Sequence, residues 1–197
     1  MTELVGEYGL TFTILVAVFG LLASIIGAAF DDRRAVLASK LAIIVIPILL
    51  TASAWALMQA MMTSDFRFEY VVNYTELALP DGYKFAAFWA GQEGSLLFWA
   101  WLLGLVGAGA LFTWRKKTGK EYTIAYGVLA AVTGFFALLM VFVPEANPFR
   151  MVEGAIPADG NGLNPMLQDP GMIIHPPLLF VGYAGYTVPF ALLIGVL

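Results

Sequence analysis

The sequence contains no cysteine and only one histidine, His175. The absence of cysteine excludes disulfide bonds, a thiolate nucleophile, and zinc or iron–sulfur sites with cysteine ligands. With one imidazole, the chain can supply a single histidine ligand to a metal site. Any metal chemistry that needs two histidines must therefore draw the second from outside this chain.

Charged residues are also scarce. Only 12% of the 197 residues are charged and 60% are hydrophobic, whereas an average soluble domain is about 25% charged and about 45–50% apolar. This composition excludes a disordered chain, a collagen-like fibre and an ordinary cytosolic enzyme. The net charge of −4 excludes a basic nucleic-acid-binding protein. The composition indicates a protein that lies in a lipid bilayer.

Five long uncharged runs follow one another along the chain. A helix needs about 20 apolar residues to cross about 30 Å of hydrocarbon, and a lone strand exposed to lipid would leave its backbone polar groups without partners. We therefore predict an all-α, polytopic membrane protein, with residues 1–197 forming a single transmembrane domain. The predicted helices span about 8–30, 41–64, 85–114, 122–144 and 172–197.

Seven of the ten Lys and Arg residues lie in two short loops, 31–40 and 115–121. The positive-inside rule places these loops in the cytoplasm. The N-terminus and the two long loops, 65–84 and 145–171, are then expected outside the inner (cytoplasmic) membrane. Because the chain stops at Leu197 without a flanking loop or charge, we expect a fragment of a larger bundle or one piece of a split protein.

The two long loops are too apolar for disordered segments. Aromatic residues recur in the first loop, at Phe66, Phe68, Tyr70 and Tyr74, and Asn-Pro and Asp-Pro pairs divide the second. Apolar side chains that alternate with turn-forming pairs indicate a folded lid over the membrane face. Residues 158–162, which combine Gly with Asp, are the expected flexible tip.

One carboxylate, Glu93, falls where the third helix enters the bilayer. An ionisable group at that depth is costly unless it is paired or near water, so Glu93 is a functional candidate. We expect it to be paired or hydrogen-bonded and to shape the outer mouth of the bundle near Trp89. The alternative is an interfacial carboxylate that the dipole of the nearby helix N-terminus stabilises.

His175 precedes two prolines, Pro176 and Pro177, at the start of the fifth helix. A proline biases the residue before it toward an extended backbone, and Pro177 suits the first turn of the helix that follows. We therefore expect a rigidly mounted imidazole at the outer membrane surface, where a neutral imidazole is a good iron ligand. A hydrogen-bonded interfacial histidine with no ligand role is the alternative.

Three stretches resemble the N-terminal region of the CcmF/NrfE haem lyase family, which is part of the cytochrome c assembly superfamily. They are 85–99 (FAAFWAGQEGSLLFW), 147–149 (NPF) and 163–183 (LNPMLQDPGMIIHPPLLFVGY). The likeness covers essentially the whole chain, including helix order and loop lengths. It implies a function in cytochrome c biogenesis, in which haem is presented on the outer membrane face and joined covalently to apocytochrome c.

In that family the first of two external histidines occupies the His-Pro-Pro position. The resemblance therefore implies that His175 is an axial ligand to the iron of a b-type haem under transfer. It extends haem binding to a set of motif positions: Trp89, Glu93, Asn164, Gln168, Asp169, His175 and Pro176. The basic residues on that side, Arg67, Lys84 and Arg150, are the local candidates for pairing with haem propionates.

The resemblance also implies what lies outside this chain. The second axial ligand, a tryptophan-rich segment and the histidines of a resident haem are expected there. The implied partners are apocytochrome c, haem-delivery and other maturation subunits, the remainder of a CcmF-like protein and membrane lipid, with no nucleic acid. The chain is then part of a haem lyase system and not a complete enzyme.

Two other function classes stay open. An ion-coupled secondary transporter or proton-translocating subunit would use Glu93 as its ion-carrying group, with Pro47 and Pro189 as helix breaks. A structural subunit would use its loops only to dock partners. A haem absorption band that is lost in His175→Ala favours the haem hypothesis, whereas proton-coupled uptake that is lost in Glu93→Gln favours the transporter.

Overall fold

Five long helices form the body of the protein in the computed structural model, which describes residues 1–117 and 119–197. They are α1 (Thr2–Phe30), α2 (Arg33–Met62), α5 (Gln92–Trp114), α6 (Lys120–Phe142) and α7 (Pro170–Val196). The shorter elements are α3 (Glu69–Tyr74), α4 (Asp81–Ala86), and the 3₁₀ helices η1 (Ala87–Trp89), η2 (Pro144–Ala146) and η3 (Pro165–Gln168). Each long helix is long and apolar enough to cross a membrane, so the predicted all-α fold with five spans is confirmed.

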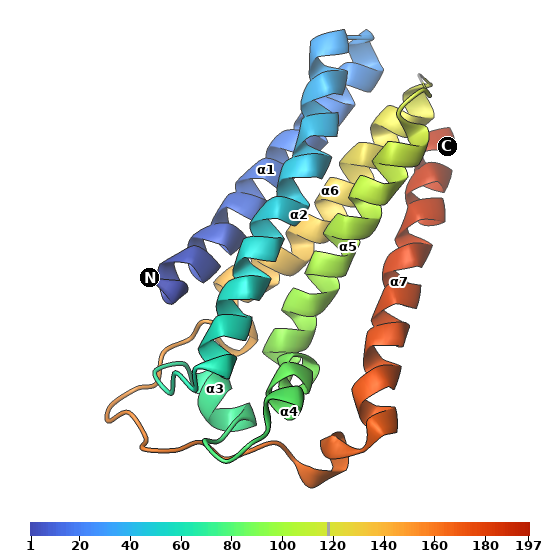
Figure 1. The fold of residues 1–197 in the computed structure, drawn as a ribbon. Helices are drawn as coiled ribbons and strands as arrows, with labels where there is room; N and C mark the ends of the chain where they lie inside the picture. The colour runs from blue at the N-terminus through green and yellow to red at the C-terminus, as the bar shows by residue number, and fades with distance from the viewer. Residues whose placement is uncertain (118) are drawn as a thin grey trace.

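The long helices run side by side, and their connections gather at two ends (Figure 1). The loops after α1 and α5 lie at one end, the short-loop end, and α3, α4 and both long loops lie at the other, the long-loop end. Helices α1, α2 and α6 pack closely on one another, whereas α7 packs on α5 and α6 at the edge of the bundle. Much of the surface of α7 therefore stays exposed.

Small residues allow α1 to approach α6 closely. A Cβ atom built at Gly134 would lie 2.6 Å from the Cβ of Ala17, and one built at Gly127 would lie 1.8 Å from the Oγ of Ser24. In a bilayer, where both helices and lipid are apolar, such close backbone approach is a main source of helix association. The α1–α6 interface thus depends on the absence of side chains at these glycines.

The helix bounds differ from the sequence prediction at the short-loop end. Helix α2 begins at Arg33, so Arg33, Arg34 and Lys40, for which the sequence predicts a loop, are helical. At the opposite end of the bundle α1 begins at Thr2, before the predicted start at residue 8. Hydropathy marks only the part of a helix that lies in hydrocarbon, and these helices continue beyond it. The connection is reduced to Asp31 and Asp32, and the Asp32 side chain accepts a hydrogen bond from the backbone N–H of Arg34 at 2.8 Å.

The third predicted helix, 85–114, is not continuous. The structure divides it into α4, η1 and α5, with Gly91 in an extended conformation between η1 and α5. The break depends on contacts with α3 that are distant in sequence and are described below. Asp32, Gly91 and their neighbours show that apolar length locates a span better than it locates its ends.

Gly134→Ala is predicted to destabilise the protein. The added methyl group would overlap Ala17, which is fixed to the α1 backbone, and overpacking of this kind costs about 1–3 kcal/mol. The control is Gly109→Ala in α5, where a Cβ atom meets nothing within 4 Å. The thermal unfolding midpoint of the detergent-solubilised protein should fall only for Gly134→Ala; equal midpoints for the two variants would contradict the close packing.

Candidate functional site at the long-loop end

The two long loops are hydrogen-bonded to each other. The backbone N–H of Glu69 donates to the carbonyl of Arg150 at 2.9 Å, and that of Val152 donates to the carbonyl of Arg67 at 2.8 Å. These bonds flank an antiparallel bridge between Phe68 and Met151. The two long loops thus form one folded layer, the lid, over the long-loop end, as the aromatic residues and turn pairs of the sequence indicate.

Residues 158–162, expected to be a flexible tip, are bonded to the first loop. The Asp159 carboxylate accepts from the backbone N–H of Leu77 at 2.8 Å, and the N–H of Asn161 donates to the carbonyl of Val72 at 2.7 Å. The sequence prediction of a free tip is therefore wrong here. Asp159 and Gly160 instead form part of a close contact between the two long loops.

Phe149 anchors this layer to the bundle. Its side chain is fully buried, with its ring edge-on to Phe68 at a centroid distance of 6.4 Å. It also covers Gly6 of α1, where a Cβ atom would lie 2.2 Å from the ring. The Asn147 side chain holds the turn by accepting from the backbone N–H of Phe149 at 2.8 Å. The Asn-Pro-Phe triplet therefore fixes the second loop to the start of α1.

The buried hydroxyl of Tyr70 organises the break before α5. It donates to the carbonyl of Ala87 at 2.9 Å, with the Phe88 carbonyl at 3.1 Å, and it accepts from the backbone N–H of Gly91 at 3.1 Å. Burial raises the pKa of the Tyr70 phenol far above its ordinary value, so the hydroxyl keeps its proton and can donate. One side chain of α3 thus bonds to three backbone polar groups at the break, and it gives the N–H of Gly91 its acceptor.

Glycines make room for the two tyrosines of α3. A Cβ atom at Gly94 would lie 2.2 Å from the hydroxyl oxygen of Tyr70, and one at Gly91 would lie 2.3 Å from the ring of Tyr74. The rings of Tyr70 and Tyr74 lie 4.6 Å apart. Sequence reasoning treated these tyrosines only as loop aromatics and missed their part in shaping this site. Their Tyr-x-x-x-Tyr spacing, which places them on one helix face, is the available signal.

Trp89 and Glu93 lie on either side of this break and line different cavities. Trp89 packs between Phe85, at 5.3 Å, and Phe98, at 5.5 Å, beside an apolar cavity of about 250 Å³ between α2 and α5. Glu93 lines a cavity of about 180 Å³ with Glu69, Tyr70, Glu145, Asn147 and Arg150. The structure therefore does not bring Glu93 to the mouth beside Trp89.

Glu93 forms no ion pair in the described part of the chain, so the first of the two expected arrangements, pairing, is not found. Among the described residues no cation lies within 4.0 Å of its carboxylate. The nearest candidate in the cavity, Arg150, pairs instead with Glu69 at 3.0 Å and with Glu153 at 3.7 Å. Glu93 is the second residue of α5, where the helix dipole favours a negative charge. This position agrees with the alternative of an interfacial carboxylate.

His175 is helical, and the expected extended backbone before Pro176 is wrong. Helix α7 begins earlier, at Pro170, where the Asp169 side chain accepts from the backbone N–H of Gly171 at 2.8 Å. A capped start with proline at the first position outweighs the local bias of Pro176. Because Pro176 and Pro177 have no N–H, the helical carbonyls of Met172 and Ile173 receive no backbone donor from them.

The imidazole of His175 is exposed on the outward side of α7. His175 precedes the buried Ala184 by nine positions, which places the two side chains on opposite sides of the helix. Exposed apolar side chains surround it on the same helix, namely Ile174, Leu178 and Leu179. This surface can offer one iron ligand and an apolar contact to one face of a porphyrin. The second ligand must come from elsewhere, because His175 is the one histidine of the sequence.

Asn164, Gln168 and Asp169 orient the start of α7. The Asn164 side chain accepts from the backbone N–H of Met166 at 3.0 Å, and Gln168 donates to the carbonyl of Leu163 at 3.0 Å. With the Asp169 cap, these bonds fold the loop into η3 and then into α7. The three residues thus act on the position of His175 through the backbone.

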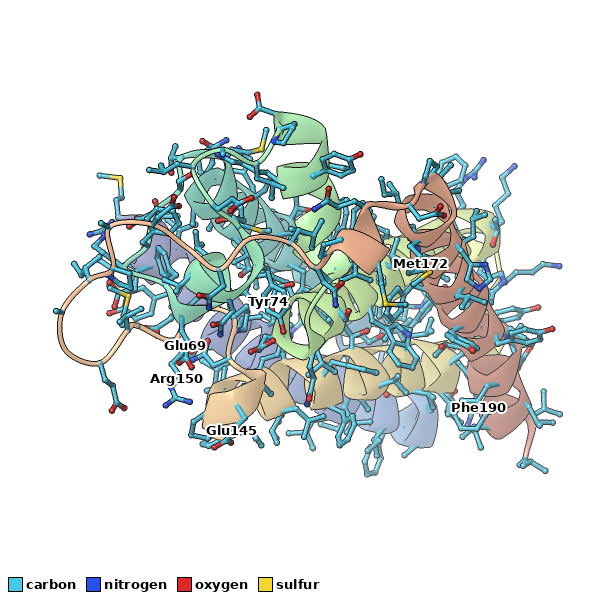
Figure 2. All side chains as sticks on the ribbon, turned by 90° about the horizontal axis from the view of Figure 1, so that it is seen from below. Glu69, Tyr74, Glu145, Arg150, Met172 and Phe190 are labelled. Atoms are coloured by element: carbon cyan, nitrogen blue, oxygen red, sulfur yellow. The ribbon has the colours of Figure 1, made fainter. Side chains whose placement is uncertain are left out.

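The basic residues of this end are engaged within the protein. Arg67 donates to the Asp65 carboxylate at 2.8 Å, and this hydrogen bond lowers the pKa of Asp65. Lys84 is buried and donates to the hydroxyl of Ser64 at 2.8 Å. Figure 2, seen from the long-loop end, shows Glu69, Glu145 and Arg150 together, with Met172 and Phe190 of α7 across the molecule. Arg150 is thus separated from the exposed face of α7.

Comparisons with known proteins converge on one family. The family model described as cytochrome C assembly protein matches residues 89–197. The chain is 42% identical over 142 residues to the cytochrome c-type biogenesis protein NrfE of Haemophilus influenzae, covering 72% of this chain and 22% of that one. It is 36% identical over 166 residues to CcmF of Escherichia coli, covering 84% and 25%, and 32% identical over 195 residues to CycK of Rhizobium meliloti, covering 98% and 28%.

A solved structure has the same fold. A cytochrome c haem lyase CcmF superposes with a TM-score of 0.80 at 23% sequence identity, covering 97% of this chain and 29% of that one. The chain therefore spans about a quarter of the length of the curated relatives that it matches.

Tyr70→Phe is predicted to lower stability, because it leaves the buried N–H of Gly91 without its acceptor. An unsatisfied buried group of this kind costs about 1–3 kcal/mol. The matched control is Tyr74→Phe, which keeps the ring against Gly91 and removes the hydroxyl of the neighbouring tyrosine. Thermal unfolding followed by tryptophan fluorescence should separate the two variants. A Tyr70→Phe protein with the midpoint of the control would show that its hydroxyl does not hold the break.

Proposed function

This chain belongs to the cytochrome c assembly protein family, in its CcmF/NrfE branch, and from this premise we propose that it forms one wall of a haem-handling site on the outer membrane face. In this proposal haem is the substrate, held for covalent attachment to apocytochrome c. His175 supplies one axial ligand to its iron. Haem-delivery and other maturation subunits are the proposed partners, together with the rest of a CcmF-like protein.

The observation that carries the proposal is the outward position of His175 on α7. The imidazole stands on a capped, rigid helix start, and the apolar side chains around it are exposed. A porphyrin can lie against such a surface while its propionates stay near water. Because α7 packs on α5 and α6 at the edge of the bundle, its other side is available to a second wall that contributes the remaining ligand.

The other candidate residues have supporting roles in this proposal. Asn164, Gln168 and Asp169 set the start of α7, and Pro176 stiffens the backbone next to the ligand. Trp89 and Glu93 shape the bundle beneath the lid and line two cavities to which His175 does not contribute. Family membership favours this function over ion coupling through Glu93.

His175→Ala, made in the complete maturation system, is predicted to abolish cytochrome c maturation while the protein still inserts and accumulates. The side chain is exposed, so its loss leaves the helix contacts intact. External imidazole should partly restore maturation by occupying the vacant iron ligand position. The control is Leu193→Ala, an exposed residue about five turns further along the same side of α7 and outside the proposed haem surface, which should keep most activity. Full maturation by His175→Ala without imidazole would overturn the ligand assignment.

We also propose that the long-loop end faces outward, because most basic residues lie at the short-loop end. The chain lacks cysteine, so single introduced cysteines report their own positions. A membrane-impermeant maleimide applied to intact cells should label Glu153→Cys in the second long loop and leave Lys116→Cys unlabelled until the membrane is permeabilised. The reverse pattern would invert the topology and place His175 on the cytoplasmic side.

A further inference from the structure

The short-loop end, far from the proposed haem surface, contains a cavity of about 440 Å³ between α1, α2 and α6. Its volume is within the range of small-molecule sites, roughly 300–1,000 Å³. Five of its lining residues carry the argument: Arg33, Lys40, Lys117, Lys120 and Tyr126.

The cavity has an excess of positive charge. Four of its lining side chains are basic and one, Asp31, is acidic. Asp31 pairs with Lys120 at 3.3 Å. Among the described residues, no carboxylate lies within 4.0 Å of Arg33, Lys40 or Lys117. The lining also includes the first turn of α6, whose N-cap residue, Gly119, provides no side-chain hydrogen bond. The positive end of the α6 dipole adds to the attraction for an anion, and the acidic Glu121 of the same turn is not part of the cavity lining.

Tyr126 gives a second, independent indication of a ligand. Its side chain is 1% exposed, and its hydroxyl has no hydrogen-bond partner in the described part of the chain. The residue lines the cavity, and the amine of Lys40 lies 5.8 Å from the centre of its ring. A buried hydroxyl without a partner costs free energy. An anionic oxygen in the cavity would accept from this hydroxyl and pair with Lys40.

An apolar groove continues from this cavity along the bundle. It has a volume of about 400 Å³ and lies between α2 and α5. It shares Leu37 and Lys40 with the cavity and extends along Leu41, Ile44 and Leu111. A free phosphate would use the polar cavity alone, whereas a phospholipid would occupy both volumes, with its head group beside Lys40 and an acyl chain in the groove.

We propose that the short-loop end of this protein is a binding site for an anionic phospholipid. The phosphate lies in the cavity, held by Lys40 and the hydroxyl of Tyr126, and one acyl chain lies between α2 and α5. Basic pockets between transmembrane helices at a membrane surface recognise such head groups. A phosphate bound to Lys40 of α2 and Tyr126 of α6 would connect these two helices at the short-loop end.

Native mass spectrometry of the detergent-solubilised protein tests this site, with phosphatidylglycerol as the probe and phosphatidylcholine as the neutral comparison. Phosphatidylglycerol should bind more tightly. Lys40→Gln should weaken its binding about fivefold, which is the effect expected of one charge contact near a membrane surface. Tyr126→Phe should weaken it by a similar factor, about fivefold, because it removes one hydrogen bond to the phosphate. Arg34→Gln is the matched control, because Arg34 is a basic residue of the same helix, α2, outside the cavity lining; this variant should bind phosphatidylglycerol like the parent protein.

Ala108→Trp, which fills the groove and leaves the polar cavity intact, distinguishes lipid from free phosphate. It should weaken phosphatidylglycerol binding as well. Equal binding of the two lipids, or phosphatidylglycerol binding that both Lys40→Gln and Tyr126→Phe leave unchanged, would overturn the site. Inorganic phosphate that displaces phosphatidylglycerol at millimolar concentration, with no effect of Ala108→Trp, would overturn its assignment to a lipid.

Discussion

A buried phenol hydroxyl that bonds to three backbone groups lies where the chain passes from the lid into the bundle. The lid can rest on the long-loop end because Tyr70 satisfies the polar groups at the break between η1 and α5. In a continuous helix these backbone groups would bond to one another, and Trp89 and Glu93 would lie on a single straight helix. The break turns this segment under the lid and leaves Trp89 and Glu93 beside separate cavities. The geometry of this break therefore depends on one side chain of α3.

Apolar length predicted the five spans because crossing a bilayer is a local property of each helix. The break before α5 could not be predicted in the same way. Gly91 and Gly94 are small because Tyr74 and Tyr70, about twenty residues earlier, occupy the space where their side chains would be. Such pairings depend on tertiary contacts that periodicity does not contain. The same holds for residues 158–162, whose partners lie in the other long loop.

At the start of α7 two local backbone preferences of the sequence conflict. Pro176 favours an extended residue before it, yet the cap from Asp169 and the proline at the first helical position started the helix earlier. The resemblance of the His-Pro-Pro run pointed to this segment, and the structure shows that His175 lies on the exposed side of α7. The seven candidate residues fall into three places: the exposed face of α7, the loop that caps it, and the bundle under the lid. A ligand held at His175 must therefore be enclosed by surfaces beyond those of this helix.

The two prolines after His175 have a consequence for depth. Each leaves a carbonyl one turn earlier in α7 without its helical donor. In hydrocarbon such a carbonyl would be expensive, whereas at the membrane surface water can satisfy it. A shift of α7 deeper into the membrane would place the carbonyls of Met172 and Ile173 in hydrocarbon without hydrogen-bond partners. A shift toward water would expose the apolar residues of the rest of α7. We therefore expect the proline pair to keep His175, the one imidazole of the sequence, near the membrane surface rather than within the hydrocarbon.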